Sequence, residues 1–128
     1  MNRKDIFDYT DSHYGTKPEY LWASLPDAAV LRHSSNQKWY AVLMPVQGKK
    51  LGLDSEDFFD VLNVKCDEQL IGSLRETEGF FPAYHMNKEK WVSVLMNEKT
   101  DERLVLSLLE MSFSLTETKK STKNKLDL

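Results

Sequence analysis

Hydrophobic residues recur at helical spacing in three segments of this chain. In the first, Arg3–His13, one side of a helix would carry Ile6, Tyr9 and His13. Asn2 stands where it can cap the first turn, and Gly15 stands where the helix would end. The pattern therefore predicts an N-terminal helix with one buried face.

The second predicted helix is short, and the third closes the folded region. Asp67 can cap a helix that runs to about Arg75, and Gly79 ends this unit. Its buried side would hold Leu70, Ile71 and Leu74. Thr100 can cap the last helix, whose first turn would carry Asp101 and Glu102.

The last segment also alternates as a strand would, at Leu109, Met111, Phe113 and Leu115. Helix is favoured nevertheless, because Leu, Glu and Met are good helix formers. A stripe at helical spacing is also present, made by Leu104, Val105, Leu108, Leu109 and Ser112.

Strand patterns fill the middle of the chain. Ala29–His33 and Lys38–Leu43 are β-rich runs joined by the polar cluster Ser34–Gln37, which predicts a hairpin. Strict alternation in the second run gives two faces, with Trp39, Ala41 and Leu43 against Tyr40, Val42 and Met44. Because both faces are apolar, we expect this strand to lie inside the sheet and to be covered on both sides.

The remaining segments complete an α+β pattern. Lys17–Trp22 is a short extended piece, Pro26 and Asp27 form a turn, and Pro45–Gly52 is a loop. Two more strands are expected at Phe58–Lys65 and Trp91–Met96, with a single helical turn at Asn87–Lys90. Sequential strands with short connections predict a twisted antiparallel sheet, with N- and C-terminal helices and a short middle helix. This single domain would span residues 1–116, followed by a flexible Lys/Ser/Thr-rich tail at 117–128.

Composition limits the class of protein. The chain has 128 residues, 41% of them hydrophobic and 29% charged, which is typical of one globular domain. No apolar run approaches the roughly 20 residues that span a bilayer, so no membrane association is expected. Charges near the N-terminus argue against a signal peptide, and Cys66 is the only cysteine. These features predict a cytoplasmic protein without a disulfide.

The net charge of −3 is unevenly distributed. From Thr116 onwards four lysines outweigh Glu117 and Asp127, for +2, so the first 115 residues carry −5. A strong, non-specific nucleic-acid binder would present a basic field instead.

No sequence motif predicts a reaction, a metal or a cofactor. His13, His33 and His85 are widely separated, and neither a P-loop nor a GxGxxG motif is present. Cys66 could pair with His85 as nucleophile and base, but no third orienting group is recognisable, so a buried structural thiol is favoured. We therefore expect a protein that is not an enzyme.

The most specific stretch is PAYHMNKEKW, from Pro82 to Trp91. His85 could contact a phosphate or act as a base, or its ring could stack on Trp91 or Tyr84 in a structural role. Lys88 follows Asn87 at the start of a turn, where free N–H groups and an ammonium would suit an anion. The group Tyr84, His85, Asn87 and Lys88 is a better candidate nucleic-acid-binding site than any member alone.

Four further cations flank the hairpin and the following loop: Arg32, Lys38, Lys49 and Lys50. Projecting loops of wing-type proteins contact phosphates with such residues. The alternative role is ordinary edge-strand and loop charge that prevents sheets from pairing.

Three segments in this order and spacing resemble the MmcQ/YjbR family of small bacterial proteins. They are RHSSNQKWYAVLM (Arg32–Met44), VLNVKCDEQLIGSLR (Val61–Arg75) and FPAYHMNKEKWVSVLM (Phe81–Met96). PEYLW (Pro18–Trp22), KLGL (Lys50–Leu53) and LLEMSFSL (Leu108–Leu115) fit as well, so the resemblance covers residues 1–116. It implies a secretion-chaperone-like or "double-wing" arrangement and a DNA-binding function, although a fold does not by itself determine function.

Three functions compete. The first is a non-enzymatic DNA-binding domain, with weak and salt-dependent binding through the projecting loops and the His85–Lys88 corner. The second is an adaptor that binds a protein partner and has no nucleic-acid role. The third is small-ligand binding or catalysis near Tyr84 and His85, which requires an apolar pocket where these side chains converge.

Overall fold

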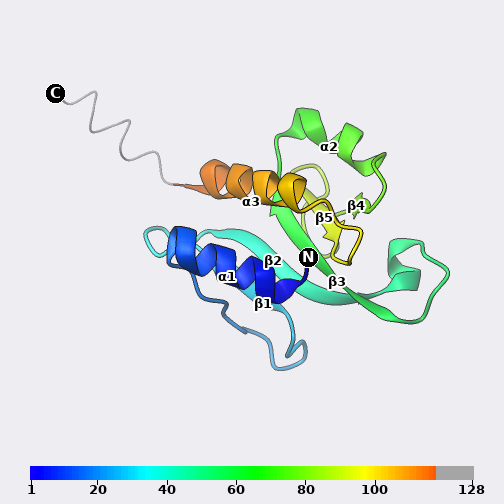
Figure 1. The fold of residues 1–128 in the computed structure, drawn as a ribbon, viewed down its shortest axis with the longest axis horizontal. Helices are drawn as coiled ribbons and strands as arrows, with labels where there is room; N and C mark the ends of the chain where they lie inside the picture. Colours follow the sequence, from blue (N-terminus) through cyan, green and yellow to red (C-terminus); the bar gives the residue numbers. More distant parts are fainter. Residues whose placement is uncertain (118–128) are drawn as a thin grey trace.

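In a computed structural model, described here for residues 1–117, three α-helices and a five-stranded antiparallel sheet form one α+β unit (Figure 1), as predicted. The sheet order is β1-β2-β3-β5-β4. The elements are α1 (Arg3–Tyr14), β1 (Ala29–Arg32), β2 (Trp39–Gln47), the 3₁₀-helix η1 (Gly48–Leu51), β3 (Phe58–Lys65), α2 (Glu68–Arg75), β4 (Phe80–Pro82), β5 (Trp91–Leu95) and α3 (Glu102–Thr116). The predicted tail lies outside the described residues from Thr118 onwards.

The helix ends follow from local hydrogen bonds. In α1 the Asn2 side chain accepts from the Asp5 N–H at 3.1 Å, and the Asp5 carboxylate accepts from the Asn2 N–H at 3.0 Å, which forms a capping box. Gly15 ends α1 in the left-handed region, at φ 66°. Asp67 caps α2 by accepting from the Gln69 N–H at 3.0 Å. These predicted caps are confirmed.

The predicted cap of α3 is wrong by one residue. Asp101, not Thr100, accepts from the Leu104 N–H at 3.2 Å. The Thr100 hydroxyl instead accepts from the Asn97 N–H at 2.7 Å and donates to the Leu95 carbonyl at 2.9 Å. Thr100 therefore closes the turn between β5 and α3.

The predicted faces of β2 are wrong at its first two residues. Leu31 pairs with Ala41 and Arg32 pairs with Trp39, so Tyr40 is an extra residue in a β-bulge. The bulge turns Tyr40 into the same hydrophobic cluster as Ala41, and Trp39 to the opposite side of the sheet. Strict alternation cannot reveal this exchange, because both side chains are aromatic.

β2 is also longer than predicted, since it continues through Pro45 to Gln47. Pro45 pairs with Asp60 of β3, but β1 has already ended, because its first residue, Ala29, pairs with Leu43. At Pro45 one side of β2 therefore has no neighbouring strand. A strand tolerates proline at such a position, because no partner needs its missing N–H group. The sequence analysis likewise did not predict the short strand β4, which pairs with β5 from Phe80 to Pro82.

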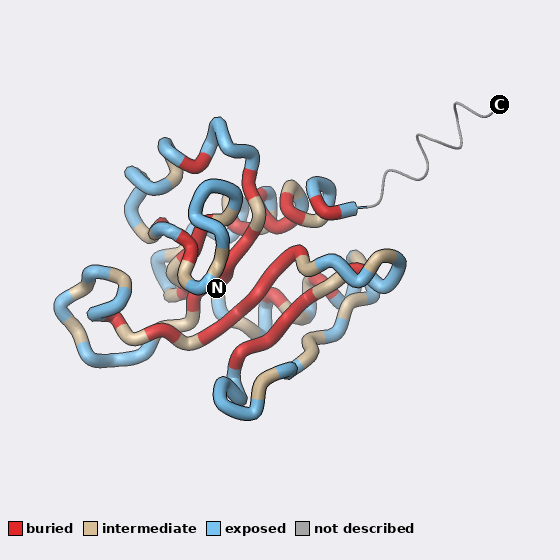
Figure 2. Tube along the Cα trace, turned by 180° about the vertical axis from the view of Figure 1, so that it is seen from behind, coloured by how far each residue is buried: buried red, intermediate tan, exposed pale blue. Residues whose placement is uncertain are grey.

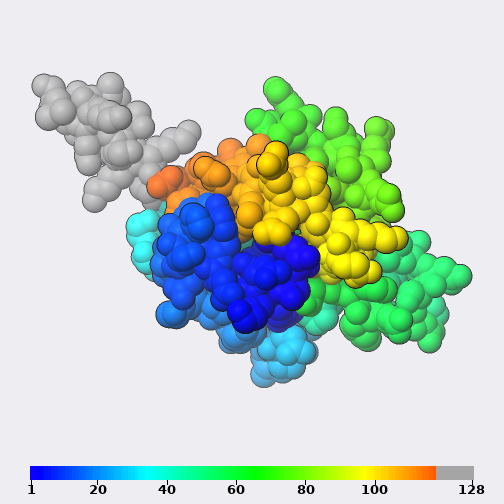
Figure 3. Space-filling model, viewed as in Figure 1, coloured from blue at the N-terminus to red at the C-terminus, as the bar shows by residue number. Residues whose placement is uncertain are grey.

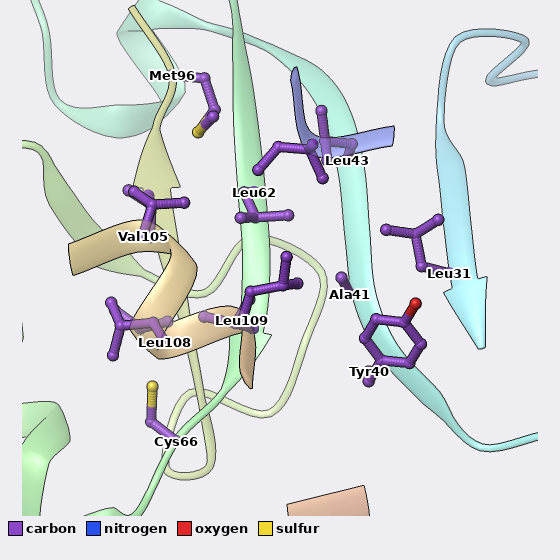
Figure 4. Close-up of a cluster of buried hydrophobic side chains, with 14 of the residues drawn as sticks. Leu31, Tyr40, Ala41, Leu43, Leu62, Cys66, Met96, Val105, Leu108 and Leu109 are labelled. Carbon is purple, nitrogen blue, oxygen red and sulfur yellow. The ribbon is translucent and has the colours of Figure 1, made fainter. Parts of the chain in front are cut away.

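The two faces of the sheet are covered differently. Helices α1 and α3 lie over one face (Figures 1 and 3). Tyr14 of α1 stacks on Phe113 of α3, with ring centroids 4.0 Å apart. The larger core lies beneath them and includes Leu43, Leu62 and Leu109 (Figure 4). From the opposite side, buried strands are seen with no helix over them (Figure 2). The smaller core on that face is covered by loops and by side chains such as Trp22.

Two sets of hydrogen bonds connect the helices to the sheet. The Ser112 hydroxyl of α3 donates to the Tyr40 carbonyl at the bulge and accepts from the Lys65 N–H at 2.9 Å. The Arg3 guanidinium forms two hydrogen bonds with the Asp60 carboxylate, at 2.7 and 2.9 Å, and one with the Asp27 carbonyl at 3.0 Å. Arg3 thus joins α1 to β3 and to the loop before β1. Among residues 1–117, no helix is long and apolar enough to cross a membrane.

Stability is expected to depend on His33, which is buried beside Phe113 and shares a 2.8 Å hydrogen bond with the Thr116 hydroxyl. Burial lowers the pKa of His33 from its ordinary value of 6.5. The folded state then binds fewer protons than the unfolded state, so the free energy of unfolding falls as the pH drops below about 6.5. Denaturant unfolding between pH 7.5 and 5.5 measures this slope.

His33→Gln should flatten that pH dependence whatever its effect on absolute stability. The matched control is His13→Gln, because His13 is exposed on α1. Equal slopes in the two variants would contradict a role for His33.

Candidate functional site

The face of the sheet without helices carries a groove formed by two adjoining cavities. One cavity, of 230 Å³, has a floor of β2 residues and polar groups at its rim. The other, of 250 Å³, lies between two tryptophans. Both cavities are lined by Leu25, Met44 and His85, so they form one continuous groove.

Three segments far apart in the chain form the groove walls. The loop from Trp22 to Ala28, the segment that holds η1 and Phe58, and the strap 84–86 all contribute lining residues. The groove is therefore built by tertiary packing and not by one local motif.

A buried polar network fixes the strap. The Tyr84 N–H donates to the Ser93 hydroxyl at 3.0 Å, and that hydroxyl donates to the Asn63 side-chain oxygen. Asn63 and Ser93 are fully buried on β3 and β5, and the Asn63 amide also reaches the Val42 carbonyl at 3.4 Å. The position of the Tyr84 backbone is thus tied to three strands.

His85 lies at the centre of the groove in an unusual backbone conformation. Its φ is 63°, in the left-handed region that non-glycine residues seldom adopt and that is enriched at functional sites. The side chain is exposed, and its ring centroid lies 4.1 Å from that of Tyr84. Within residues 1–117 no hydrogen bond involves its ring nitrogens. The two rings are in contact but tilted by 55°, so the predicted stacking on Tyr84 is not formed, and both His85 nitrogens are open to a ligand.

Lys50 is the predicted cation that converges with this strap. Its ammonium lies 5.9 Å from the centroid of the Tyr84 ring, and its side chain lines the same cavity as Tyr84 and His85. No carboxylate of residues 1–117 forms an ion pair with Lys50. A cation, an imidazole and a phenol therefore meet at one end of an apolar groove.

The structure does not gather the other predicted cations into one patch. Arg32 forms a two-point ion pair with Glu19, at 2.6 and 2.7 Å, whose hydrogen bonds lower the pKa of Glu19. Lys49 pairs with Glu56 at 2.6 Å. Lys38 and Lys88 are exposed and form no ion pair with the described residues. Lys38 precedes β2, at the end away from Lys50, and Lys88 follows the strap.

Asn87 has a structural role. Its side-chain oxygen accepts from the Glu89 N–H at 2.9 Å, and its carbonyl accepts from the Trp91 N–H at 2.9 Å. The predicted single helical turn is present as a hydrogen-bonded turn, too short to count as a helix. The side-chain oxygen of Asn87 therefore already has a hydrogen-bond partner within this turn, which contains Lys88 and Glu89.

The YjbR family model matches residues 11–115. The chain belongs to this family. It is 43% identical over 116 residues to the uncharacterized protein YyaQ of Bacillus subtilis (strain 168), covering 91% of this chain and 98% of YyaQ. A crystal structure of a protein from Pseudomonas syringae is similar with a TM-score of 0.88 and 46% identity, covering 91% of this chain and all of that one. Deinococcus radiodurans protein DR2400 shares the fold, with a TM-score of 0.69 and 22% identity over 94% and 85% of the two chains.

Membership in the YjbR family does not identify a ligand, because the similar proteins carry no stated activity. The fold and the family resemblance expected from the sequence are confirmed. The DNA-binding role, the partners and the site residues remain predictions.

Sequence reasoning missed most of the groove lining. Trp22 and Trp39 meet edge to face, with ring centroids 5.6 Å apart and planes at 84°, and Met44 and Met86 line the same cavity. Alternation placed Trp39 on the same face as Ala41 and Leu43, and the bulge moves it here. The signal that could have found the groove is the second apolar face of β2, together with a tryptophan, Trp22, close to the turn at Pro26 and Asp27.

The alternative chemical sites are not supported. Cys66 lies in the core under the helices beside Leu108, on the face opposite His85, and burial raises the pKa of its thiol to about 11 (Figure 4). Residues 1–117 contain no group of three His, Cys, Asp or Glu side chains that could hold a metal. A larger cavity of 350 Å³ lies between Leu53, β4, β5 and the start of α3, but none of the predicted site residues lines it.

Proposed function

We propose that this protein is a non-enzymatic nucleic-acid-binding domain and that it takes a single strand along the groove on the helix-free face. The observation that carries the proposal is the convergence of Lys50, His85 and Tyr84 at an aromatic-lined groove. Proteins that bind single strands combine cations for the backbone with aromatic side chains for the bases. A duplex keeps its bases stacked inside, so it would leave such an apolar groove unused.

The length of β2 fits this ligand. Nine residues separate Lys38 from the start of η1, which holds Lys50, and they span roughly 30 Å at the usual rise of an extended strand. Trp39 follows Lys38 in the chain, Tyr84 lies beside Lys50, and both rings line the groove. A cation and an aromatic ring towards each end of β2 can hold several nucleotides.

The net acidic charge limits the affinity. Of the predicted cations without an ion pair among residues 1–117, Lys50 lines the groove and Lys38 directly precedes β2, so about two phosphates would be neutralised and log K should fall with log salt at a slope of about −1.4. We expect a Kd on the order of 10⁻⁵ M at low salt, as for weak non-specific binding.

The test is a fluorescence-anisotropy titration of labelled single-stranded and duplex oligonucleotides at two salt concentrations. Lys50→Ala should weaken single-strand binding by about fivefold and make the salt slope shallower by about 0.7. Lys99→Ala removes the same charge from an exposed lysine outside the groove and should change affinity by less than about twofold. Absence of binding at low salt, or equal effects of the two substitutions, would refute the proposal.

A second candidate is an adaptor that binds a protein partner, and one observation favours it. The rim of the groove exposes Leu25 and Phe58, with 45% and 67% of their surfaces accessible. Exposed apolar side chains around a groove are typical of protein-interaction sites. This candidate predicts a stable complex that survives nuclease treatment and is lost in Phe58→Ser.

A further inference from the structure

The two halves of the groove differ in chemistry. The half at Lys50 is also lined by the polar residues Asp27 and Gln47. The half at Trp22 is lined by two tryptophans, two methionines, a leucine and a valine, with His85 as the only polar member. A ligand that fills both halves must itself have a polar anionic part joined to an apolar part.

We infer that the Trp22–Trp39 cavity is a pocket for one nucleobase, whose own phosphate lies at Lys50 and His85. This inference rests on the proposed function and assigns the base and the phosphate of one nucleotide to the two halves of the groove. The site would then recognise one nucleotide within a longer strand that is held weakly.

The size of the pocket suits a single ring system. Its volume is 250 Å³, below the roughly 300–1,000 Å³ of pockets that hold whole drug-sized ligands. The two indole rings are nearly perpendicular, at 84°, so a flat base can stack on one indole while the edge of the other meets it. Methionine side chains at Met44 and Met86 adapt to bases of different shape.

His85 lines both halves, and its backbone lies in the left-handed region. Its ring contacts Tyr84 on the side of Lys50, where an imidazole can donate a hydrogen bond to a phosphate. Asp27 would repel a phosphate placed beside it, so the phosphate is expected on the Lys50 side, with Asp27 available to accept from a sugar hydroxyl or a base amino group.

The experiment compares a single-stranded oligonucleotide with one of equal length whose sugars carry no bases. Trp91→Phe is the background chain, so that the fluorescence comes from Trp22 and Trp39. We expect the normal strand to quench this fluorescence and to bind about tenfold more tightly than the abasic strand, the advantage typical of a base stacked on aromatic side chains. Trp22→Leu in the same background should reduce this advantage to less than about twofold.

The outcomes separate the two proposals. Equal binding of normal and abasic strands, without quenching, overturns the base pocket and leaves a groove that binds phosphates. Retention of the tenfold advantage in Trp22→Leu also overturns it. If neither strand binds at low salt, the proposed function itself fails.

Discussion

Replacing Leu62 with alanine is expected to lower the free energy of unfolding by about 3 kcal/mol, as for other fully buried leucines. Leu62 lies on β3 in the middle of the sheet, has no exposed surface and contacts the core under α1 and α3 (Figure 4). The substitution removes apolar burial and leaves a cavity that the neighbouring strands cannot close. Denaturant unfolding measured by circular dichroism gives the change.

The matched control is Leu70→Ala on α2, because 40% of the surface of Leu70 is exposed. The same atoms are removed there without a buried cavity, so the expected loss is less than about 1 kcal/mol. A loss of similar size in both variants would show that the core beneath the helices is not as closely packed as the structure indicates.

Replacing Ser93 with alanine is expected to cost about 2–3 kcal/mol of stability and also to weaken ligand binding. The hydroxyl accepts from the Tyr84 N–H and donates to Asn63, so its removal leaves two groups without partners near the core. The strap that carries Tyr84 and His85 then loses its tie to β5. Faster amide hydrogen exchange at Tyr84 and a severalfold weaker oligonucleotide affinity should accompany the loss of stability.

Ser107→Ala provides the comparison, since Ser107 is exposed on α3 and its hydroxyl forms no hydrogen bond with residues 1–117. It should change neither stability nor binding measurably. If Ser93→Ala lowered stability but left exchange at Tyr84 unchanged, the network would stabilise the core without positioning the strap.

The three helices and the N-terminal caps of α1 and α2 were predictable because their signals are local. The capping box of α1 needs only Asn2 and Asp5, three residues apart, and the end of α1 needs only Gly15. The choice of helix for the last segment, against its alternating pattern, is confirmed by α3. In this segment the good helix formers and the apolar stripe at helical spacing outweighed the alternation of hydrophobic residues, because a helix satisfies its own backbone hydrogen bonds.

The candidate site was less predictable because its chemistry depends on distant partners. Nothing near Arg32 in the chain shows that Glu19 neutralises it. The ion pair forms only because Glu19 pairs with Val30 of β1 in a β-bridge. The convergence of Lys50 with Tyr84 and His85 likewise joins segments more than thirty residues apart. Sequence reasoning named the strap as a candidate but could not decide which of the predicted cations lies beside it.

The amino-acid sequence by itself determined the α+β order of elements, the family and the absence of a recognisable catalytic motif, because periodicity, capping and motif spacing are encoded over a few neighbouring residues. Only the tertiary structure decided that no helix of residues 1–117 covers one face of the sheet and that a bulge at Tyr40 turns Trp39 onto that face. The physical reason is that strand pairing fixes which side of the sheet a residue occupies, and a single extra residue in one strand reverses it.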